Sequence, residues 1–238
     1  MLATVVESER SVPRRAGAKM LVFADGSQSG TIGGGEMESR VVSEALDTLA
    51  DGRPRMIDYV LVDPGRGDPG VCGGTVRIYL EPYMPAPTIY IVGCGHVGRA
   101  VAELAAWLGF RVVATDDRAT AATPEAVPEA EVVLGGPIAE VLQREPVTDQ
   151  THVVVVTRNV ALDLETLPHL VRTPARSIGV MGSARRWATT RAELAKRGLT
   201  EADLDRITAP IGLEIAAETP EEIAVSILAE IVAQRRAP

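Results

Sequence analysis

The chain has 238 residues, a length that fits one large domain or two ordinary ones. Hydrophobic residues make up 46% and charged residues 24%, as in soluble globular proteins, and only 3% are aromatic, so the apolar content is aliphatic and suits a parallel sheet covered by helices. The net charge of −8 argues against nucleic acid or an anionic membrane surface as a partner.

Two cysteines, Cys72 and Cys94, are too few for a disulfide framework or a thiolate metal site, so each is expected to be a free thiol in a reducing compartment. The three histidines lack metal-ligand spacing. The first ten residues lack the basic and apolar regions of a signal peptide, and no apolar stretch approaches about 20 residues. We therefore expect a cytoplasmic protein with no membrane-spanning segment.

A cluster of prolines between Pro82 and Pro87 predicts a short, semi-rigid linker, because proline stiffens the chain. We expect three parts. They are an N-terminal α+β domain over residues 1–84, a linker over residues 85–88, and a Rossmann-like domain over residues 89–238.

The sequence pattern of the N-terminal part predicts three strands and one helix. Apolar residues repeat at helical spacing from Val41 to Ala50, and Gly52 is a stop signal, while the flanking segments alternate as strands do. The predicted elements are a strand over Lys19–Ala24, a helix from about Glu36 to Ala50, and strands over Met56–Val62 and Thr75–Leu80.

The C-terminal part alternates strands with helices, which predicts a doubly wound parallel sheet. The expected strands cover residues 88–92, 111–115, 131–134, 152–157 and 177–181. The expected helices cover residues 97–108, 138–144, 162–171, 184–197 and 220–235. The last helix has a clear start, with Thr219 as its N-cap and Pro220 in its first position.

The segment Gly93-Cys94-Gly95-His96-Val97-Gly98 directly follows a predicted strand and opens a predicted helix. In a dinucleotide-binding turn, the first glycine permits the tight bend, the second leaves room for a pyrophosphate, and the third lets helix and strand pack closely. The helix N-terminus offers free amides to the phosphates. Gly93, Gly95 and Gly98 therefore predict a nucleotide site, and the alternative is a turn that serves packing alone.

Asp116 ends the next predicted strand, eighteen residues after Gly98, where a carboxylate accepts hydrogen bonds from an adenine ribose. S-adenosylmethionine and dinucleotide-linked pterins would also suit this loop. His96 either caps the turn or has a catalytic role.

Two loops in the N-terminal part have a similar character. Gly33, Gly34 and Gly35 precede a predicted helix and form either a backbone nest for an anion or a flexible turn. Cys72 and Gly73 lie in a glycine-rich loop before a strand, where a thiolate could ligate a soft metal or carry sulfur. The alternative for Cys72 is a small buried apolar side chain.

The segment Gly182-Ser183-Ala184-Arg185-Arg186 starts a helix just after a predicted strand, at the edge where open α/β sheets bind ligands. Ser183 and Arg185 are candidate binding residues, and Arg185 or Arg186 could clamp a phosphate unless both are solvated surface residues. The sequence has no G-x-S-x-G elbow, Walker lysine loop or H-E-x-x-H motif. We therefore predict binding through glycine loops and find no nucleophile or general-base constellation.

Several segments together resemble a known family. SVPRRAGAKM at residues 11–20, GTIGGGEMESRV and GVCGG are similar to the N-terminal domain of the XdhC/CoxI family, the accessory factors of xanthine dehydrogenase and related molybdenum hydroxylases. IVGCGHVGRAVA, GVMGSARRW and the ending ITAPIGLEIAAETPEEIAVSILAEI are similar to its Rossmann-type C-terminal domain. The resemblance covers nearly the whole chain.

The resemblance implies a role in maturation. Such factors bind the molybdenum cofactor (molybdopterin, often as a dinucleotide), promote exchange of an oxo for a sulfido ligand, and deliver the cofactor to the apo-hydroxylase. The implied partners are the target molybdenum hydroxylase and a cysteine desulfurase, and Cys72 becomes the candidate for contact with molybdenum. A homodimer is a further expectation.

One segment departs from the family pattern. Where the family often has Thr-His-x-His, this chain has Thr157-Arg158-Asn159-Val160, so Arg158 and Val160 replace both histidines. Any metal or proton-transfer role of those histidines is then absent or performed otherwise, and the protein could belong to a divergent subfamily or carry a different cargo.

Two other functions stay open at this point. The glycine turn with Asp116 would serve an NAD(P)-dependent oxidoreductase, and the carboxylate would favour NAD because a 2′-phosphate would meet its charge. A regulatory module that senses a nucleotide and controls domain docking would need the same turn.

Overall fold

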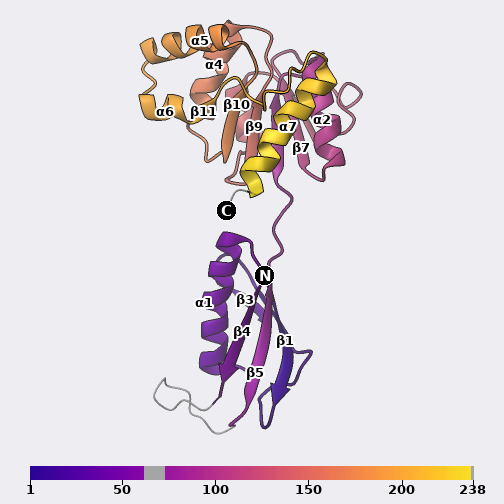
Figure 1. Ribbon diagram of the computed structural model, residues 1–238, viewed down its shortest axis with the longest axis vertical. Helices are drawn as coiled ribbons and strands as arrows, with labels where there is room; N and C mark the ends of the chain where they lie inside the picture. Colours follow the sequence, from indigo (N-terminus) through magenta and orange to yellow (C-terminus); the bar gives the residue numbers. More distant parts are fainter. Residues whose placement is uncertain (62–72, 237–238) are drawn as a thin grey trace. The chain divides into compact units, whose positions relative to one another are not determined.

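Figure 1 shows the computed structural model of the chain, which describes residues 1–61 and 73–236. The contacts divide the chain into two compact units, Met1–Pro85 and Ala86–Pro238. Cys72 lies outside the described residues. Within the described part, no helix is long and apolar enough to cross a membrane.

In its described residues the first unit is an antiparallel sheet with one helix, so the expected smaller α+β domain is confirmed (Figure 1). The strands lie in the order β3-β2-β1-β5-β4. The elements are β1 (Leu2–Glu9), β2 (Lys19–Val22), β3 (Gln28–Gly30), α1 (Gly35–Asp51), β4 (Arg55–Val60) and β5 (Thr75–Glu81). Strands β1 and β3 were not predicted from the sequence, although β1 is the central strand.

The core of this unit lies between one face of the sheet and α1. Alternate residues of the strands point to this face, among them Val5, Met20 and Ile78, and they pack against Val41 and Ala45 of the helix. The helix stops at Gly52, whose φ of +66° lies in the left-handed region that suits glycine.

The second unit is a six-stranded parallel sheet in the order β8-β7-β6-β9-β10-β11, which confirms the expected Rossmann-like fold. Its strands are β6 (Thr88–Val92), β7 (Arg111–Asp116), β8 (Val132–Gly135), β9 (Thr151–Val155), β10 (Ser177–Val180) and β11 (Ile207–Thr208). Its helices are α2 (His96–Trp107), α3 (Ile138–Arg144), α4 (Val160–Leu170), α5 (Ala184–Lys196), α6 (Glu201–Asp205) and α7 (Pro220–Arg236). The short elements α6 and β11 were not predicted.

Helices cover both faces of this sheet. On one face, α2 and α7 lie together, and Val101 and Leu228 pack against Ile89 and Ile91 of β6. On the other face, α3, α4 and α5 pack against β6, β9 and β10 around residues such as Leu167. The strands β6 and β9 are buried at every position, so they carry continuous apolar runs.

The order of the strands determines where a ligand can enter. The chain proceeds from β6 through β7 to β8 on one side and then returns to β9 on the other side of β6. The loops after β6 and β9 therefore diverge, and in open α/β sheets this point is where the binding crevice lies.

Candidate functional site

A pocket lies at this point, along the carboxyl ends of β6, β7, β8 and β9. Its walls include Gly93 and Gly95 after β6, Asp116 and Asp117 at the end of β7, and Arg158 after β9. The first turns of α3 and α4 also line it. The cavity volume is about 80 Å³, which holds several water molecules.

The glycine turn after β6 has the geometry of a phosphate-binding turn. Gly93 has a φ of +120°, and a Cβ there would lie 2.7 Å from the carbonyl oxygen of Val156. A Cβ on Gly98 would lie 1.9 Å from the carbonyl oxygen of Gly93, so only glycine lets α2 approach the strand this closely. These contacts explain why a side chain is excluded at both positions.

Gly95 differs from its two neighbours because a Cβ there would meet nothing within 4 Å. Gly95 is also the N-cap of α2, and no side chain of the described residues caps this helix. His96, in the first position of α2, is exposed. The helix therefore presents its first amides and its partial positive charge to open space, an arrangement suited to an anion.

Asp116 lies at the base of the turn, and its side chain is 2% exposed. Its Oδ2 accepts hydrogen bonds from the amide of Cys94 at 2.9 Å and from Nη2 of Arg118 at 3.1 Å. Its Oδ1 accepts from the amide and Nε of Arg118 at 3.0 and 2.9 Å. A ribose could bind this carboxylate only if Arg118 released it.

The same contacts control the charges at the base of the turn. Burial alone would raise the pKa of Asp116, but the hydrogen bonds from Arg118 and Cys94 outweigh it and lower the pKa to about 2. Burial raises the pKa of the Cys94 thiol to about 12, so this cysteine is an un-ionised, buried side chain at neutral pH.

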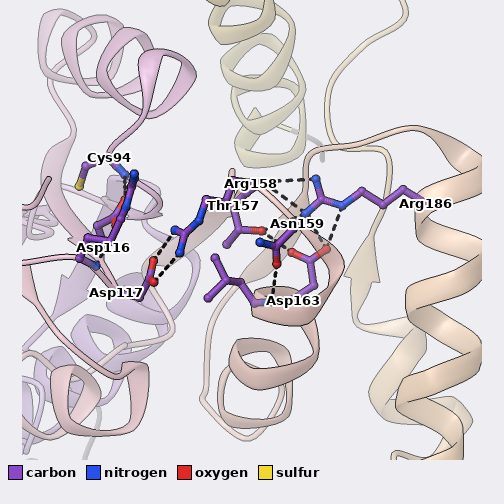
Figure 2. A network of polar contacts seen from close by, with 10 residues as sticks. Cys94, Asp116, Asp117, Thr157, Arg158, Asn159, Asp163 and Arg186 are labelled. Atoms are coloured by element: carbon purple, nitrogen blue, oxygen red, sulfur yellow. Dashed lines mark hydrogen bonds and ion pairs between the residues drawn. The ribbon is translucent and has the colours of Figure 1, made fainter.

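An ion pair joins the segments that follow β7 and β9, as Figure 2 shows. Arg158 donates to both carboxylate oxygens of Asp117, at 2.7 and 2.8 Å. Arg158 follows β9 and Asp117 follows β7, and β6 lies between these strands in the sheet. From the sequence, Arg158 stood out only as a replacement for a histidine, and Asp117 was not identified.

A buried polar network anchors the neighbouring loop (Figure 2). The Asp163 side chain is fully buried and accepts hydrogen bonds from Nε and Nη2 of Arg186, at 3.0 and 2.7 Å, and from the hydroxyl of Thr157. Arg186 also donates to the Thr157 carbonyl oxygen, at 3.3 Å. This network links α4, α5 and the loop after β9.

The same network separates the roles of the residues at the start of α5. Arg186 faces inward, whereas Arg185 is exposed. Ser183 is the N-cap of α5, and its hydroxyl accepts from the amide of Arg186 at 3.1 Å. Neither Ser183 nor Arg185 lines the pocket after β6, although both lie at the same edge of the sheet, after β10.

In the first unit, the glycine nest already holds an anion, the carboxylate of Glu38. Its Oε1 accepts from the amides of Ile32, Gly33 and Gly34 at 2.9, 3.2 and 2.8 Å and from the hydroxyl of Thr31 at 2.5 Å. Burial alone would raise the pKa of Glu38, but these hydrogen bonds outweigh it and lower the pKa. A phosphate could enter this nest only by displacing Glu38.

The other predicted residues are distributed as follows. Gly35 is the first residue of α1, and Gly73 forms a bridge with Ser11. Cys72, the candidate for contact with a metal, lies outside the described residues. Among the residues that the structure describes, no group of three or more His, Cys, Asp or Glu side chains is placed to hold a metal ion.

The strand order and the glycine turn define the second unit as a Rossmann-type domain of the kind that carries a nucleotide crevice. The family model for the XdhC Rossmann domain matches residues 89–231, and the model for the XdhC and CoxI family matches residues 1–60. The chain belongs to the XdhC and CoxI family.

Three curated relatives are similar to this chain. Uncharacterized protein YqeB of Escherichia coli (strain K12) is 36% identical over 97% of this chain and 42% of its own length. A probable xanthine dehydrogenase subunit of Bacillus subtilis (strain 168) is 31% identical over 68% of this chain and 47% of its own length. Molybdenum cofactor insertion chaperone PaoD of E. coli (strain K12) is 33% identical over 39% of this chain and 29% of its own length.

The chain therefore spans less than half the length of each of these relatives. A solved structure described as a xanthine dehydrogenase from Bacillus halodurans is 24% identical and covers 99% of this chain and 91% of its own, with a TM-score of 0.57. At this identity the match shows the shared fold.

Proposed function

We propose that this protein binds the molybdenum cofactor, as molybdopterin or its dinucleotide, and takes part in maturing a molybdenum hydroxylase. The observation that carries the proposal is the open glycine turn, in which the uncapped N-terminus of α2 faces free space beside Gly95. The names of two relatives, a molybdenum cofactor insertion chaperone and a probable xanthine dehydrogenase subunit, support this choice of ligand.

In this proposal the crevice holds the phosphate end of the cofactor. The first amides of α2, from His96 to Gly98, are hydrogen-bond donors to its phosphates, and Gly93 keeps the turn tight enough to present them. Ser183 and Arg185, after β10, provide further contacts along the same edge. Asp116 contributes by holding the base of the turn through the Cys94 amide, while Arg118 occupies the other acceptor positions of its carboxylate.

The first unit carries further candidate residues for the cofactor. Gly33, Gly34 and Gly35 offer amides once Glu38 is displaced, and Gly73 adjoins Cys72. We assign Cys72 the contact with molybdenum or with the sulfur that replaces its oxo ligand, because a soft thiolate suits both. Cys72→Ser should lower sulfuration more than tenfold, while Cys94→Ala should not, since the Cys94 thiol is buried and un-ionised. Equal sulfuration by Cys72→Ser and wild type would remove the thiol from the proposal.

The partners in this proposal are an apo molybdenum hydroxylase, which receives the cofactor, and a cysteine desulfurase, which supplies sulfur. We expect these encounters in the cytoplasm, with a homodimer as the working unit and with no nucleic acid or membrane partner. The test is to mix the purified full chain, loaded with molybdopterin under anaerobic conditions, with the apo-hydroxylase and to measure the activity that returns. A rate and yield equal to those with free cofactor would reject the proposal.

The second candidate is an NAD(P)-dependent oxidoreductase, which the glycine turn and Asp116 favour. The engagement of both Asp116 oxygens by protein donors weighs against it. Titration of the protein into NADH separates the two functions. An oxidoreductase should change the emission of the nicotinamide, whereas the maturation factor should leave it unchanged.

A further inference from the structure

Three arginines border the crevice and its neighbouring loop, namely Arg118, Arg158 and Arg186, and each is paired with a carboxylate. An arginine can bind a phosphate only if it leaves its partner or shares it. The burial of the partner decides how costly this is, because a buried carboxylate that loses its cation is left uncompensated, whereas an exposed one is hydrated by water.

Two of the three arginines are held by buried carboxylates. The partner of Arg118 is Asp116, with a side chain 2% exposed, and the partner of Arg186 is the fully buried Asp163. All three arginines make two side-chain hydrogen bonds to their partners, so the burial of the partner is what separates them. Neither Arg118 nor Arg186 can be released without stranding a buried charge.

Arg158 is held differently. Its side chain is 46% exposed and that of its partner Asp117 is 38% exposed, so water can solvate both groups when they separate. Exposed ion pairs of this kind contribute little to stability. Among the three, Arg158 is therefore the arginine whose ion pair a ligand can replace at a small cost in free energy.

The surroundings of Arg158 favour a phosphate. Arg158 lines the same pocket as Gly95 and Arg118, and it precedes the first residue of α4 by two positions. The pKa of Arg118 is raised, mainly by its hydrogen bond to Asp116, while the charge of Arg158 acts in the opposite direction, so the two guanidinium groups repel each other. An anion placed between them would relieve that repulsion and would also meet the positive ends of α2 and α4.

We propose that Arg158 forms a phosphate subsite of the crevice, with Asp117 as a built-in competitor that a phosphate ester must displace. The inference rests on the proposed function, because it names how the crevice recognises a phosphate-bearing ligand. In the free protein the Asp117 carboxylate occupies the guanidinium of Arg158, and in the complex the phosphate takes the same bidentate position. A ligand without phosphate gains no binding free energy from Arg158.

The test is calorimetric titration of the full chain with ADP, inorganic pyrophosphate and adenosine as probes. Arg158→Gln should weaken ADP and pyrophosphate binding by about tenfold or more, because a charge-assisted bidentate contact is lost. Asp117→Asn should tighten both by up to about fivefold, because the competitor is weakened. Adenosine should respond to neither substitution. Both positions are half-exposed, so the variants should fold, which the melting temperature checks.

Two controls make the outcome decisive. The double variant should bind ADP like Arg158→Gln alone, since Asp117 acts through Arg158. Arg77→Gln removes an arginine that is 48% exposed and ion-paired in the other unit, and it should leave ADP affinity unchanged. A loss of affinity in Arg77→Gln equal to that in Arg158→Gln would show a net-charge effect and overturn the inference.

The failure of this inference differs from that of the proposed function. Equal ADP affinity of wild type and Arg158→Gln, or no binding of ADP and pyrophosphate by wild type, overturns the phosphate subsite. Failure of wild type to restore hydroxylase activity overturns the maturation role, whatever the affinity for ADP.

Discussion

Two glycine-rich loops of the chain each open a helix, and they differ in whether a side chain of the described residues binds their amides. In the first unit, the amides of Gly33 and Gly34 bind the carboxylate of Glu38, which is on the helix itself. In the second unit, the start of α2 beside Gly95 has no cap among the described side chains. A glycine nest therefore marks a place for an anion, but it does not tell whether the anion is a ligand.

The difference arises from the position of one carboxylate. Glu38 stands on the first turns of α1 and returns to the nest that precedes it. The first turn of α2 has no acidic residue, and of the hydrogen bonds that Asp116 accepts, the one from the glycine turn comes from the Cys94 amide at its base, while the others come from Arg118. The four predictions that follow test this contrast, from the largest expected effect to the smallest.

Filling the open site should have the largest effect. Gly95→Val should abolish binding of ADP and of the cofactor, because the side chain would occupy the space that a phosphate needs. The fold should survive, since the φ of −76° at Gly95 suits any residue and a Cβ there meets nothing within 4 Å. Calorimetry measures the loss, with the melting temperature as the check on folding. Binding as tight as that of wild type would mean that the ligand site lies elsewhere.

Gly98→Ala should instead damage the fold of the second unit. Its Cβ would lie 1.9 Å from the carbonyl oxygen of Gly93, so α2 and β6 must separate, and we expect a loss of about 3 kcal/mol or more in unfolding free energy. Gly95→Ala is the matched control and should change stability by less than about 1 kcal/mol. Urea denaturation measures both, and similar losses in the two variants would contradict the packing role assigned to Gly98.

Glu38→Gln should destabilise the first unit by about 2 kcal/mol, because the carboxylate that serves three amides and the Thr31 hydroxyl is replaced by a neutral amide. Glu36→Gln, in the same helical turn, is the control and should have a small effect. Denaturant unfolding of the full chain, monitored by the hydrogen exchange of amides in α1, measures the change in unfolding free energy. If the two variants unfold alike, the nest does not depend on the Glu38 carboxylate.

Asp116 should make the stability of the second unit depend on acid pH. Because the folded pKa is about 2 and the ordinary value is 3.8, the ionised carboxylate contributes on the order of 2 kcal/mol above pH 4. This contribution is lost as the pH falls from 4 to 2. Asp116→Asn should remove this part of the pH dependence, and unfolding free energies measured between pH 5 and pH 2 test it. A parallel pH profile in the variant would contradict the assignment.

Much of the second unit could be predicted from the sequence, because its central strands carry apolar runs such as residues 153–155 and because α7 has a clear start signal at Thr219. The strand β6 and the helix α3 have the predicted bounds. In contrast, β1 was missed although it is central, since its buried residues Ala3 and Val5 are followed by charged ones that form no strand pattern. The short α6 and β11 carry too few residues for a periodic signal.

In the candidate site, too, some features could be predicted from the sequence and others could not. The spacing of Gly93, Gly95 and Gly98 identified the turn, because the backbone leaves no room for a side chain at the first and the third of these positions. The pairing of Arg158 with Asp117 could not be read from the sequence, since these residues are 41 positions apart. They follow β9 and β7, which are the two neighbours of β6 in the sheet, and this strand order is a property of the tertiary structure. The choice between Arg185 and Arg186 likewise depended on Asp163, which lies on another helix.

The sequence by itself determined the family, the alternation of strands and helices, and the glycine turns, because these depend on local periodicity and on backbone sterics. Only the tertiary structure decided that the Glu38 carboxylate fills the first glycine nest and that Arg158, unlike Arg118 and Arg186, is paired with a half-exposed carboxylate. The reason is physical: the cost of separating two charges depends on their burial, and burial is set by how distant segments pack together.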